Sequence, residues 1–203
     1  MNSRKYAIYG GTFDPIHNGH ISLALSAVRE CGIDKLIFMP DYVSPFKQDK
    51  KVTDGNDRCG MIESVLNMDP AFCLSRYELR KTGPSYTIET LRHWSDMLGS
   101  DLSFVLGFDS VVQVNTWYHG EEILNDYHLI TGRRPDTDDR EGLETIERFR
   151  REYGARITVL EMEPVDASST EIRERIRDGR PVDGLVPPQV EKYITEHDLY
   201  KNI

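Results

Sequence analysis

The two residues best placed to do chemistry are His17 and His20, which lie three positions apart in the segment Gly10-Gly11-Thr12-Phe13-Asp14-Pro15-Ile16-His17-Asn18-Gly19-His20. An apolar, strand-like run precedes this segment, and a helix-like run follows it. Residues three apart in the first turn of a helix share one face. There they lie beside free backbone N–H groups and the positive end of the helix dipole, where anions bind. The glycines allow a ligand to approach the backbone closely, so the segment predicts a phosphate site.

A second candidate lies near the other end of the chain, at Ser168-Ser169-Thr170-Glu171-Ile172-Arg173. Ser168 or Ser169 can cap a helix, and Arg173, one turn further on, can bind a phosphate through two hydrogen bonds. Alone, this pattern is more typical of a plain helix cap followed by a solvated arginine. Together with the paired histidines, it predicts that the serines, Thr170 and Arg173 bind one polyphosphate.

The composition is that of an ordinary globular protein, with 38% hydrophobic and 29% charged residues among 203. We expect one domain over 1–203, whose last part, from about 165 to 203, is a helical subregion that carries the second motif. The net charge of −9 argues against the broad basic surface that nucleic-acid binding needs. A site for polyanions must then be a local positive region on an acidic protein.

The cysteines indicate a reducing compartment. Cys31, Cys59 and Cys73 are widely spaced and form no CxxC pair, as is typical of reduced thiols. The polar start resembles no signal peptide, and no apolar run has the length of a transmembrane helix. We therefore expect a cytoplasmic protein without a membrane partner, and leave homo-oligomerisation open.

Strand-like and helix-like runs alternate from end to end. The expected strands are Lys5–Tyr9, Lys35–Met39, Ala71–Ser75, Leu102–Leu106, His128–Thr131 and Arg156–Leu160. The expected helices are Gly19–Glu30, Asn56–Asn67, Thr87–Leu98, Arg140–Tyr153, Ser169–Asp178 and Pro188–Glu196. This alternation predicts an α/β fold, a Rossmann-like, doubly wound parallel sheet of about five to six strands with helices on both faces. Ligands of such sheets bind beyond the carboxyl ends of the strands, at the switch point.

The eleven-residue segment resembles the GxFDPxHxGH signature of the HxGH-type nucleotidyltransferases, and the second motif resembles their SSTxIR segment. The stretches Ser85-Tyr86-Thr87-Ile88-Glu89-Thr90-Leu91 and Leu106-Gly107-Phe108-Asp109-Ser110, followed by Trp117, are similar to one branch, the bacterial nicotinate mononucleotide adenylyltransferases. The resemblance runs from about Lys5 to Leu199-Tyr200. It implies adenylyl transfer from ATP to nicotinate mononucleotide, which gives deamido-NAD and pyrophosphate in NAD biosynthesis.

Such a reaction requires positioning and charge stabilisation rather than a protein nucleophile, because the attacking group is already an anion. The resemblance implies that His17 and His20 contact the ATP phosphates, aided by the Thr12 hydroxyl and by charge on protonated imidazoles. Further expected ATP-binding residues are Gly10, Gly11, Phe13, Gly107, Asp109, Arg134, Ser168, Ser169, Thr170 and Arg173. Asp14 is expected to fix the turn by accepting bonds from backbone N–H groups. No metal-ligand pattern is present, so Mg²⁺ is expected to arrive on the ATP phosphates.

The second substrate needs an aromatic platform and donors for its carboxylate. The resemblance implies that Trp117 stacks on the nicotinate ring and that Ser85, Tyr86, Thr87 and Lys47 complete the site. As alternatives, Trp117 is a core residue and Thr87 only caps its helix.

Two positions depart from the family pattern. Phe46 replaces a histidine in the loop Asp41–Gly55, which is expected to be mobile over the site. Phe108 replaces a small residue and suggests an altered adenosine pocket.

Two other functions remain open on sequence grounds. A phosphopantetheine adenylyltransferase shares the HxGH-type motif but normally has threonine where His17 stands. A non-catalytic nucleotide-binding protein of the same fold would bind ATP without turnover.

Overall fold

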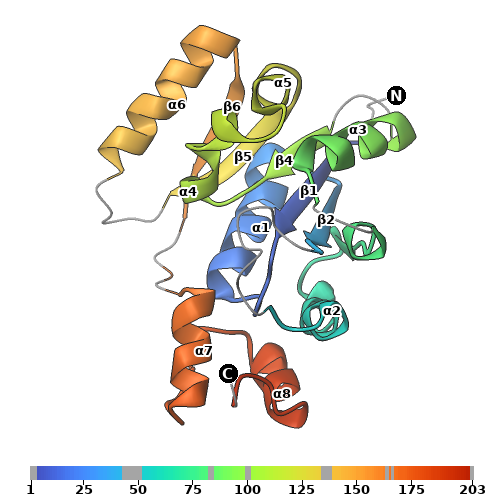
Figure 1. Ribbon diagram of the computed structural model, residues 1–203, viewed down its shortest axis with the longest axis vertical. Coiled ribbons are helices and arrows are strands. Elements are labelled where there is room, and N and C mark those ends of the chain that lie inside the picture. The colour runs from blue at the N-terminus through green and yellow to red at the C-terminus, as the bar shows by residue number, and fades with distance from the viewer. Residues whose placement is uncertain are drawn as a thin grey trace.

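The centre of the molecule is a parallel sheet of six strands in the order β3-β2-β1-β4-β5-β6 (Figure 1). In this computed structural model the described residues are 4–42, 52–81, 85–98, 102–133, 139–162, 165 and 167–201. The strands are β1 (Tyr6–Gly11), β2 (Lys35–Pro40), β3 (Phe72–Leu74), β4 (Leu102–Val105), β5 (His128–Arg133) and β6 (Arg156–Glu161). The order reverses between β1 and β4, so the switch point of a Rossmann-like sheet lies there. The predicted fold class is confirmed.

Helices cover both faces of this sheet because successive residues of a strand point to opposite sides. In β1, Ala7 and Tyr9 join one hydrophobic cluster and Ile8 joins the other. The first cluster packs under α1 (Asn18–Cys31), α2 (Gly55–Glu63), α7 (Ser169–Arg177) and α8 (Pro188–Glu196). The second packs under α3 (Thr87–Leu98), α4 (Phe108–Val111), α5 (Gly120–Asp126) and α6 (Arg140–Tyr153).

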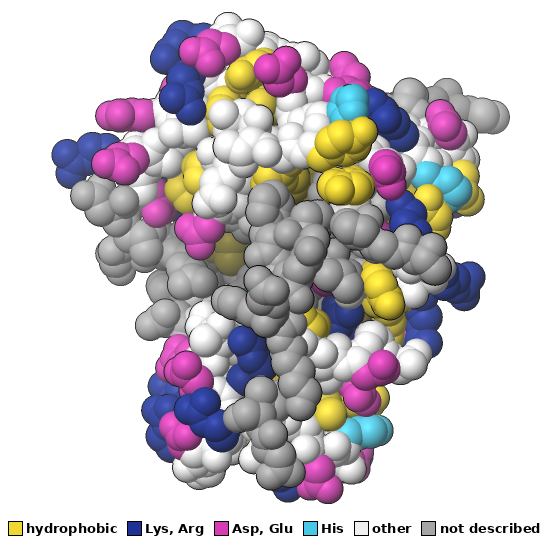
Figure 2. Space-filling model, in the orientation of Figure 1, with side chains coloured by type: hydrophobic (Ala, Val, Ile, Leu, Met, Phe, Trp, Pro, Cys, Tyr) yellow, Lys and Arg dark blue, Asp and Glu magenta, His cyan; other side chains and the backbone are white. Residues whose placement is uncertain are grey.

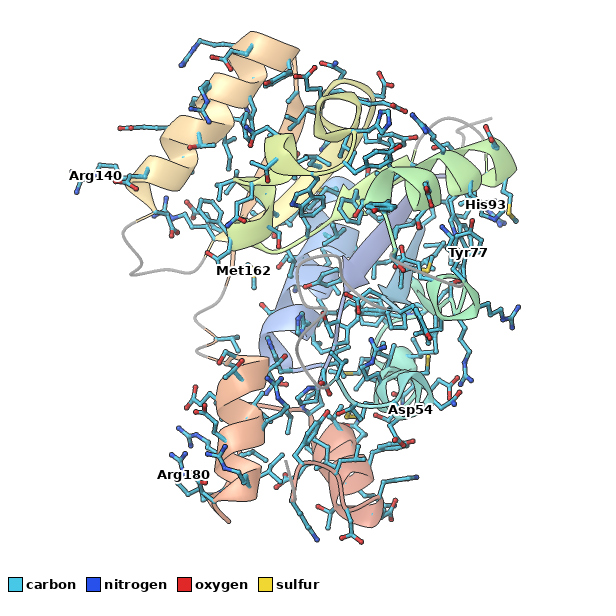
Figure 3. The ribbon with its side chains drawn as sticks, viewed as in Figure 1. Asp54, Tyr77, His93, Arg140, Met162 and Arg180 are labelled. Atoms are coloured by element: carbon cyan, nitrogen blue, oxygen red, sulfur yellow. The ribbon has the colours of Figure 1, made fainter. Side chains whose placement is uncertain are left out.

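Two differences from the expected elements have local causes. The helix expected over Asn56–Asn67 ends at Glu63, and a 3-10 turn follows at Leu66–Met68. The Ser64 hydroxyl donates to the Met61 carbonyl at 2.7 Å, and such bonds compete with continued helix. Gly55, expected in the loop before this helix, is its first residue, and Asp54 caps it by accepting from the Asn56 amide at 2.8 Å (Figure 3). The short helices α4 and α5 were not expected at all.

The C-terminal helices share the core of the sheet. Ile172 of α7 and Val190 and Ile194 of α8 belong to the same buried cluster as Tyr9 and Phe13. α7 and α8 lie together at the bottom of Figure 1, next to the start of α1. The second motif is thereby brought to the carboxyl end of β1.

The surface carries mixed charge. On the face seen in Figure 2, basic and acidic side chains are interspersed over the upper and lower helices. Within the described part of the chain, no helix is long and apolar enough to cross a membrane.

Candidate active site

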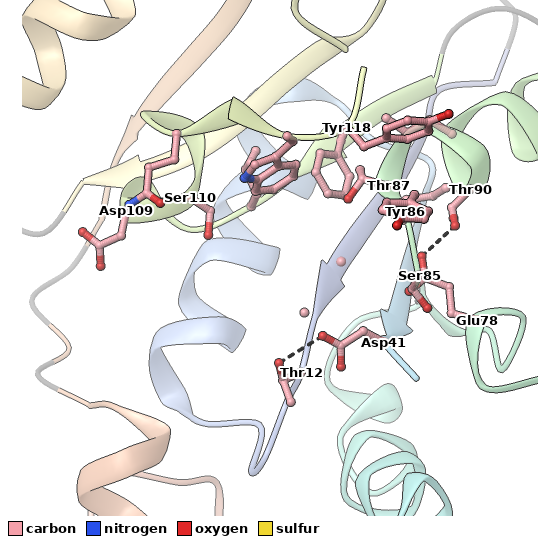
Figure 4. Close-up of a pocket in the computed structure, with 18 residues that line it drawn as sticks. Thr12, Asp41, Glu78, Ser85, Tyr86, Thr87, Thr90, Asp109, Ser110 and Tyr118 are labelled. Atoms are coloured by element: carbon pink, nitrogen blue, oxygen red, sulfur yellow. Dashed lines mark hydrogen bonds between the residues drawn. The ribbon is translucent and has the colours of Figure 1, made fainter. Parts of the chain in front are cut away.

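A cavity of about 360 Å³ lies at the carboxyl ends of β1 and β4, the switch point of the sheet (Figure 4). This volume is typical of small-molecule sites. Its floor includes Gly10 and Gly11 of β1, and its walls come from the chain before and along α3 and from the chain after β4. The expected site residues that line it are Gly10, Gly11, Thr12, Ser85, Tyr86, Thr87, Asp109 and Trp117.

Aromatic side chains form one wall of the cavity. The half-buried Trp117 meets Phe104 edge to face, with ring centroids 6.5 Å apart. Tyr86 lies 4.8 Å from Tyr118, whose ring is 56% exposed. Trp117 is therefore a wall of the cavity and not a residue enclosed in the core. An aromatic platform of this kind suits a planar ring.

The opposite wall is polar and contains a buried acid, Glu78, that the sequence did not reveal. The Thr90 hydroxyl donates to Oε1 of Glu78 at 2.7 Å, and both residues line the cavity. Burial raises the pKa of the Glu78 carboxyl, and nearby Asp41 adds to the rise. Next to this pair, the Ser85 hydroxyl accepts from the Tyr42 amide at 3.5 Å. Thr87 opens α3 and also faces the cavity.

Thr12 is held by a second buried network. Its hydroxyl donates to Oδ2 of Asp41 at 3.1 Å, rather than pointing its proton at a ligand. The guanidinium of Arg58, only 2% exposed, donates to the Thr12 carbonyl at 2.8 Å and to Oδ1 of Asp41 at 3.3 Å. Arg58 thus fixes the backbone at the end of β1. The sequence contains a weak indication that Arg58 is buried, because its spacing places it on one helical face with Ile62 and Val65, which are both buried.

The charge of the cavity differs from expectation. Among the described residues that line it, three are Asp or Glu and none is Lys, Arg or His. The three acids are Asp41, Glu78 and Asp109. The local positive region is therefore not formed by the described walls. Lys47, Arg134 and Phe46, which the sequence placed near the site, lie outside the described residues.

His17 and His20 form a close pair at the start of α1. Their ring centroids are 3.7 Å apart, and the His17 backbone amide donates to Nδ1 of His20 at 3.2 Å. An Nδ1 that accepts carries no proton, so the neutral His20 ring has its proton on Nε2.

More backbone N–H groups at the start of α1 donate hydrogen bonds to protein carbonyls than expected. The Asn18 amide donates to the Leu185 carbonyl at 2.9 Å, and the His20 and Ile21 amides donate to the His17 carbonyl. The expectation of several free N–H groups here is corrected, because the C-terminal segment and the turn itself use these donors.

The two motifs are in direct contact. The Ser169 hydroxyl donates to the Pro15 carbonyl at 3.0 Å, and Nη1 of Arg173 donates to the Asp14 carbonyl at 2.6 Å. Asn18 adds a side-chain bond to the Gly184 carbonyl at 2.8 Å. Residues far apart in sequence therefore meet at the turn that carries the buried His17. Gly10, Gly11 and Thr12 line the cavity, whereas the histidines and the second motif lie outside its lining.

Within the second motif, Ser168 caps α7 by accepting from the Glu171 amide at 3.2 Å. Thr170 is exposed, and its hydroxyl accepts from Nη2 of Arg173 at 3.3 Å. The serines thus hold the structure, whereas Arg173 has five N–H donors, more than these two bonds require. Arg173 is thus the side chain of this motif with the most donors for an anion.

Phe13 and Phe108 both pack away from the cavity. Phe13 is 1% exposed and meets Tyr9, Phe38 and His20 ring to edge, so it supports His20 from the core. Phe108 packs on α6, where a β-carbon on Gly142 would lie 2.4 Å from its Cε1. Phe108 therefore does not line the cavity, and the expected change to the pocket is not seen there.

Gly107, between β4 and α4, is exposed and has a negative φ of −65°. A β-carbon there would meet nothing within 4 Å. The fold does not require glycine at this position, and Asp109 lines the cavity two residues later. In the described chain, no group of three or more His, Cys, Asp or Glu side chains could hold a metal ion.

Comparison with known proteins identifies the relatives of this chain. A family model described as cytidylyltransferase-like matches residues 8–175. The probable nicotinate-nucleotide adenylyltransferase of Clostridium botulinum (strain Alaska E43 / Type E3) is 37% identical over 198 residues, which cover 98% of both chains. The protein of the same name from Clostridium tetani (strain Massachusetts / E88) is 34% identical over 203 residues, or 98% of this chain and all of the relative.

Solved structures agree on the fold. The nicotinic acid mononucleotide adenylyltransferase of Plasmodium falciparum complexed with NaAD superposes with a TM-score of 0.74, at 19% identity and 97% coverage of both chains. A putative nicotinate-nucleotide adenylyltransferase from Vibrio parahaemolyticus gives a TM-score of 0.69 at 20% identity, over 98% of this chain and 97% of that one.

Proposed function

This chain belongs to the cytidylyltransferase-like family and, within it, to the nicotinate-nucleotide adenylyltransferases. We propose how the residues of its cavity and of the two motifs carry out adenylyl transfer. The enzyme transfers the adenylyl group of ATP to nicotinate mononucleotide in NAD biosynthesis. A phosphate oxygen of the mononucleotide attacks the α-phosphorus of ATP, and the bond to the β-phosphate breaks. Deamido-NAD forms and pyrophosphate leaves.

One observation carries this proposal: the bonds from Ser169 to Pro15 and from Arg173 to Asp14 join the two phosphate motifs beside one cavity. The triphosphate of ATP lies over the contact between the two motifs, with His17 and His20 on one side and Arg173 on the other. Nε2–H of His20 donates to the phosphate oxygens, on which negative charge grows in the transition state. Thr170 and the amides of the capped α7 complete the phosphate contacts.

Gly10 and Gly11 act through the backbone, whereas Thr12 acts through its side chain. Thr12 holds Asp41 through its hydroxyl, and the glycines let ATP approach the end of β1. Mg²⁺ enters as part of the MgATP substrate and neutralises charge on the phosphates. Lys47 and Arg134 supply further positive charge, which the acidic walls of the cavity make necessary.

The remaining cavity residues bind the nucleoside parts of the two substrates, nicotinate mononucleotide and ATP. Trp117 and Tyr86 enclose the nicotinate ring, and Ser85 and Thr87 lie at its carboxylate. Asp109, after Gly107, accepts bonds from the adenosine ribose hydroxyls, as carboxylates at strand ends do. This arrangement uses only small-molecule partners and suits a cytoplasmic enzyme.

The test is to incubate the purified protein with MgATP and one acceptor at a time: nicotinate mononucleotide, nicotinamide mononucleotide or phosphopantetheine. We expect pyrophosphate and a dinucleotide with the first acceptor, at a higher kcat/KM than with the second. Product with phosphopantetheine alone would point to the rival transferase. Calorimetric ATP binding with no product from any acceptor would point to a nucleotide-binding protein.

A further inference from the structure

The hydroxyl of Tyr200, near the end of the chain, reaches into the turn that carries the histidines. It donates to Oδ1 of Asp14 at 2.7 Å, across 186 positions of sequence. Tyr200 is 3% exposed and Asp14 is 5% exposed, so both groups are shielded from water. Burial raises the pKa of the Tyr200 phenol, which keeps its proton available for this bond.

Asp14 is the point at which three remote segments meet the turn. Besides the Tyr200 hydroxyl, its carboxylate accepts the Thr53 amide, 39 positions along the chain, through Oδ2 at 3.2 Å. Its carbonyl accepts Nη1 of Arg173 at 2.6 Å. The chain before α2, the helix α7 and the chain after α8 are therefore all tied to one residue. A buried carboxylate of this kind is stable only when its acceptors are satisfied.

The backbone on both sides of this contact is in the left-handed region. Phe13, which precedes Asp14, has φ of 50°, and Tyr200 has φ of 66°. Residues with a β-carbon rarely adopt these angles, and such strain persists only where surrounding contacts hold it. The hydroxyl bond is one such contact, and Met61 lies beside the same oxygen, with Sδ at 3.9 Å.

We propose that Tyr200 is a positioning residue, whose hydroxyl holds Asp14 and thereby sets the placement of His17 and His20 for the reaction. The proposal rests on the adenylyltransferase function described above. Tyr200 touches no substrate. It acts through the turn, because the anchored Asp14 lies only three positions before His17 in the chain. A displacement of about 1 Å in such groups can lower a rate about 100-fold.

The variant Tyr200→Phe removes this hydroxyl and keeps the buried ring. We expect kcat to fall about tenfold or more, with KM for MgATP and for the mononucleotide changed less than about twofold. The ring ¹⁵N signals of His17 and His20 are expected to move, whereas that of His128, on β5, stays in place. The matched control is Tyr193→Phe, which removes a hydroxyl bonded to Oδ1 of Asp57 at 3.3 Å and is expected to change neither kcat nor these signals.

A second variant tests the same contact from its other side. Asp14→Ala removes both carboxylate oxygens, so the Tyr200 hydroxyl and the Thr53 amide both lose their acceptor. It is expected to reproduce the loss in kcat and the movement of the histidine signals.

Normal kcat and unmoved histidine signals in Tyr200→Phe, with only a lower melting temperature, would overturn the proposal and leave Tyr200 as a core residue. If the unmodified protein forms no dinucleotide, the proposed function fails, and the imidazole signals still decide whether Tyr200 positions the histidines.

Discussion

The backbone amide of His17 donates to Nδ1 of His20 at 3.2 Å, which commits one side of the second imidazole to the turn. The bond orients the ring of His20 and selects its neutral tautomer, in which Nε2 carries the proton. The sequence motif thus contains its own orienting contact.

Replacement of His20 should reduce turnover far more than stability. We expect His20→Ala to lower kcat about 100- to 1000-fold, the loss typical of one donor to a developing oxyanion. His20→Asn can still accept from the His17 amide and present an N–H, so its loss should be smaller. Steady-state kinetics of both variants, beside thermal melts, provide the measurement. His93→Ala is the control, because His93 stacks on Tyr77 at 4.3 Å, away from the cavity (Figure 3). Equal turnover of His20→Ala and the unmodified enzyme would contradict the assignment.

Loss of Arg58 should destabilise the whole fold. Its side chain is 2% exposed and donates to Asp41 and to the carbonyls of Thr12, Asp41 and Thr53. We expect Arg58→Ala to lower the free energy of unfolding by about 3–5 kcal/mol, because it removes a buried guanidinium together with the ion pair to the partly buried Asp41 and three bonds to carbonyls. Arg76→Ala, which breaks an exposed pair with Glu63, should change it by about 0–1 kcal/mol. Urea denaturation measures both, and a similar effect of the two variants would show that Arg58 is not a structural centre.

The contact between Phe108 and Gly142 predicts a substitution whose effect reverses sign. Gly142→Ala should destabilise the protein. The clash with the Phe108 ring should cost about 1–3 kcal/mol. The higher helix propensity of alanine should offset up to about 1 kcal/mol of this cost. In a Phe108→Ala background the clash is gone, and the same change should stabilise the protein. Urea denaturation of the four proteins gives the coupling energy. Additive effects would rule out the steric explanation.

His128 should make stability depend on pH. It bridges Oγ of Ser103 at 3.0 Å and Oγ1 of Thr158 at 2.8 Å. Burial lowers its pKa in the folded protein, and Arg156 and Lys5 lower it further. The unfolded chain, with a histidine pKa of about 6.5, therefore binds more protons than the folded one in this range, and stability falls with falling pH.

The measurement is the difference in unfolding free energy between the unmodified protein and His128→Gln. This difference should be greatest above about pH 7.5. It should shrink as pH falls through about 6.5 and level off below the lowered folded-state pKa. A difference that stays constant across this range would mean that His128 does not titrate differently in the two states.

The sequence predicted the sheet well because strand and helix periodicities are local. All six expected strands and six longer helices are present within a few residues of their expected ends. α4 and α5 were missed because four and seven residues are too few to show a helical period.

The site was predicted only where a motif marked it. Asp41, Arg58, Glu78 and Tyr200 take their roles from contacts with remote residues, as in the bond between Arg58 and the Thr12 carbonyl. The helical spacing of Arg58 with Ile62 and Val65 was only a weak signal, because it does not by itself distinguish a buried, bonded arginine from a solvated one. The motifs also predicted ligands for the Thr12 and Ser169 hydroxyls, which bind protein groups instead.

The bonds from α7 to Asp14 and Pro15 also constrain the order of events during synthesis. A nascent chain displays the histidine turn early, while the residues that hold it are still inside the ribosome. Adenylyl transfer must therefore begin late, after translation has passed the second motif, and a growing polypeptide on the ribosome should form no dinucleotide.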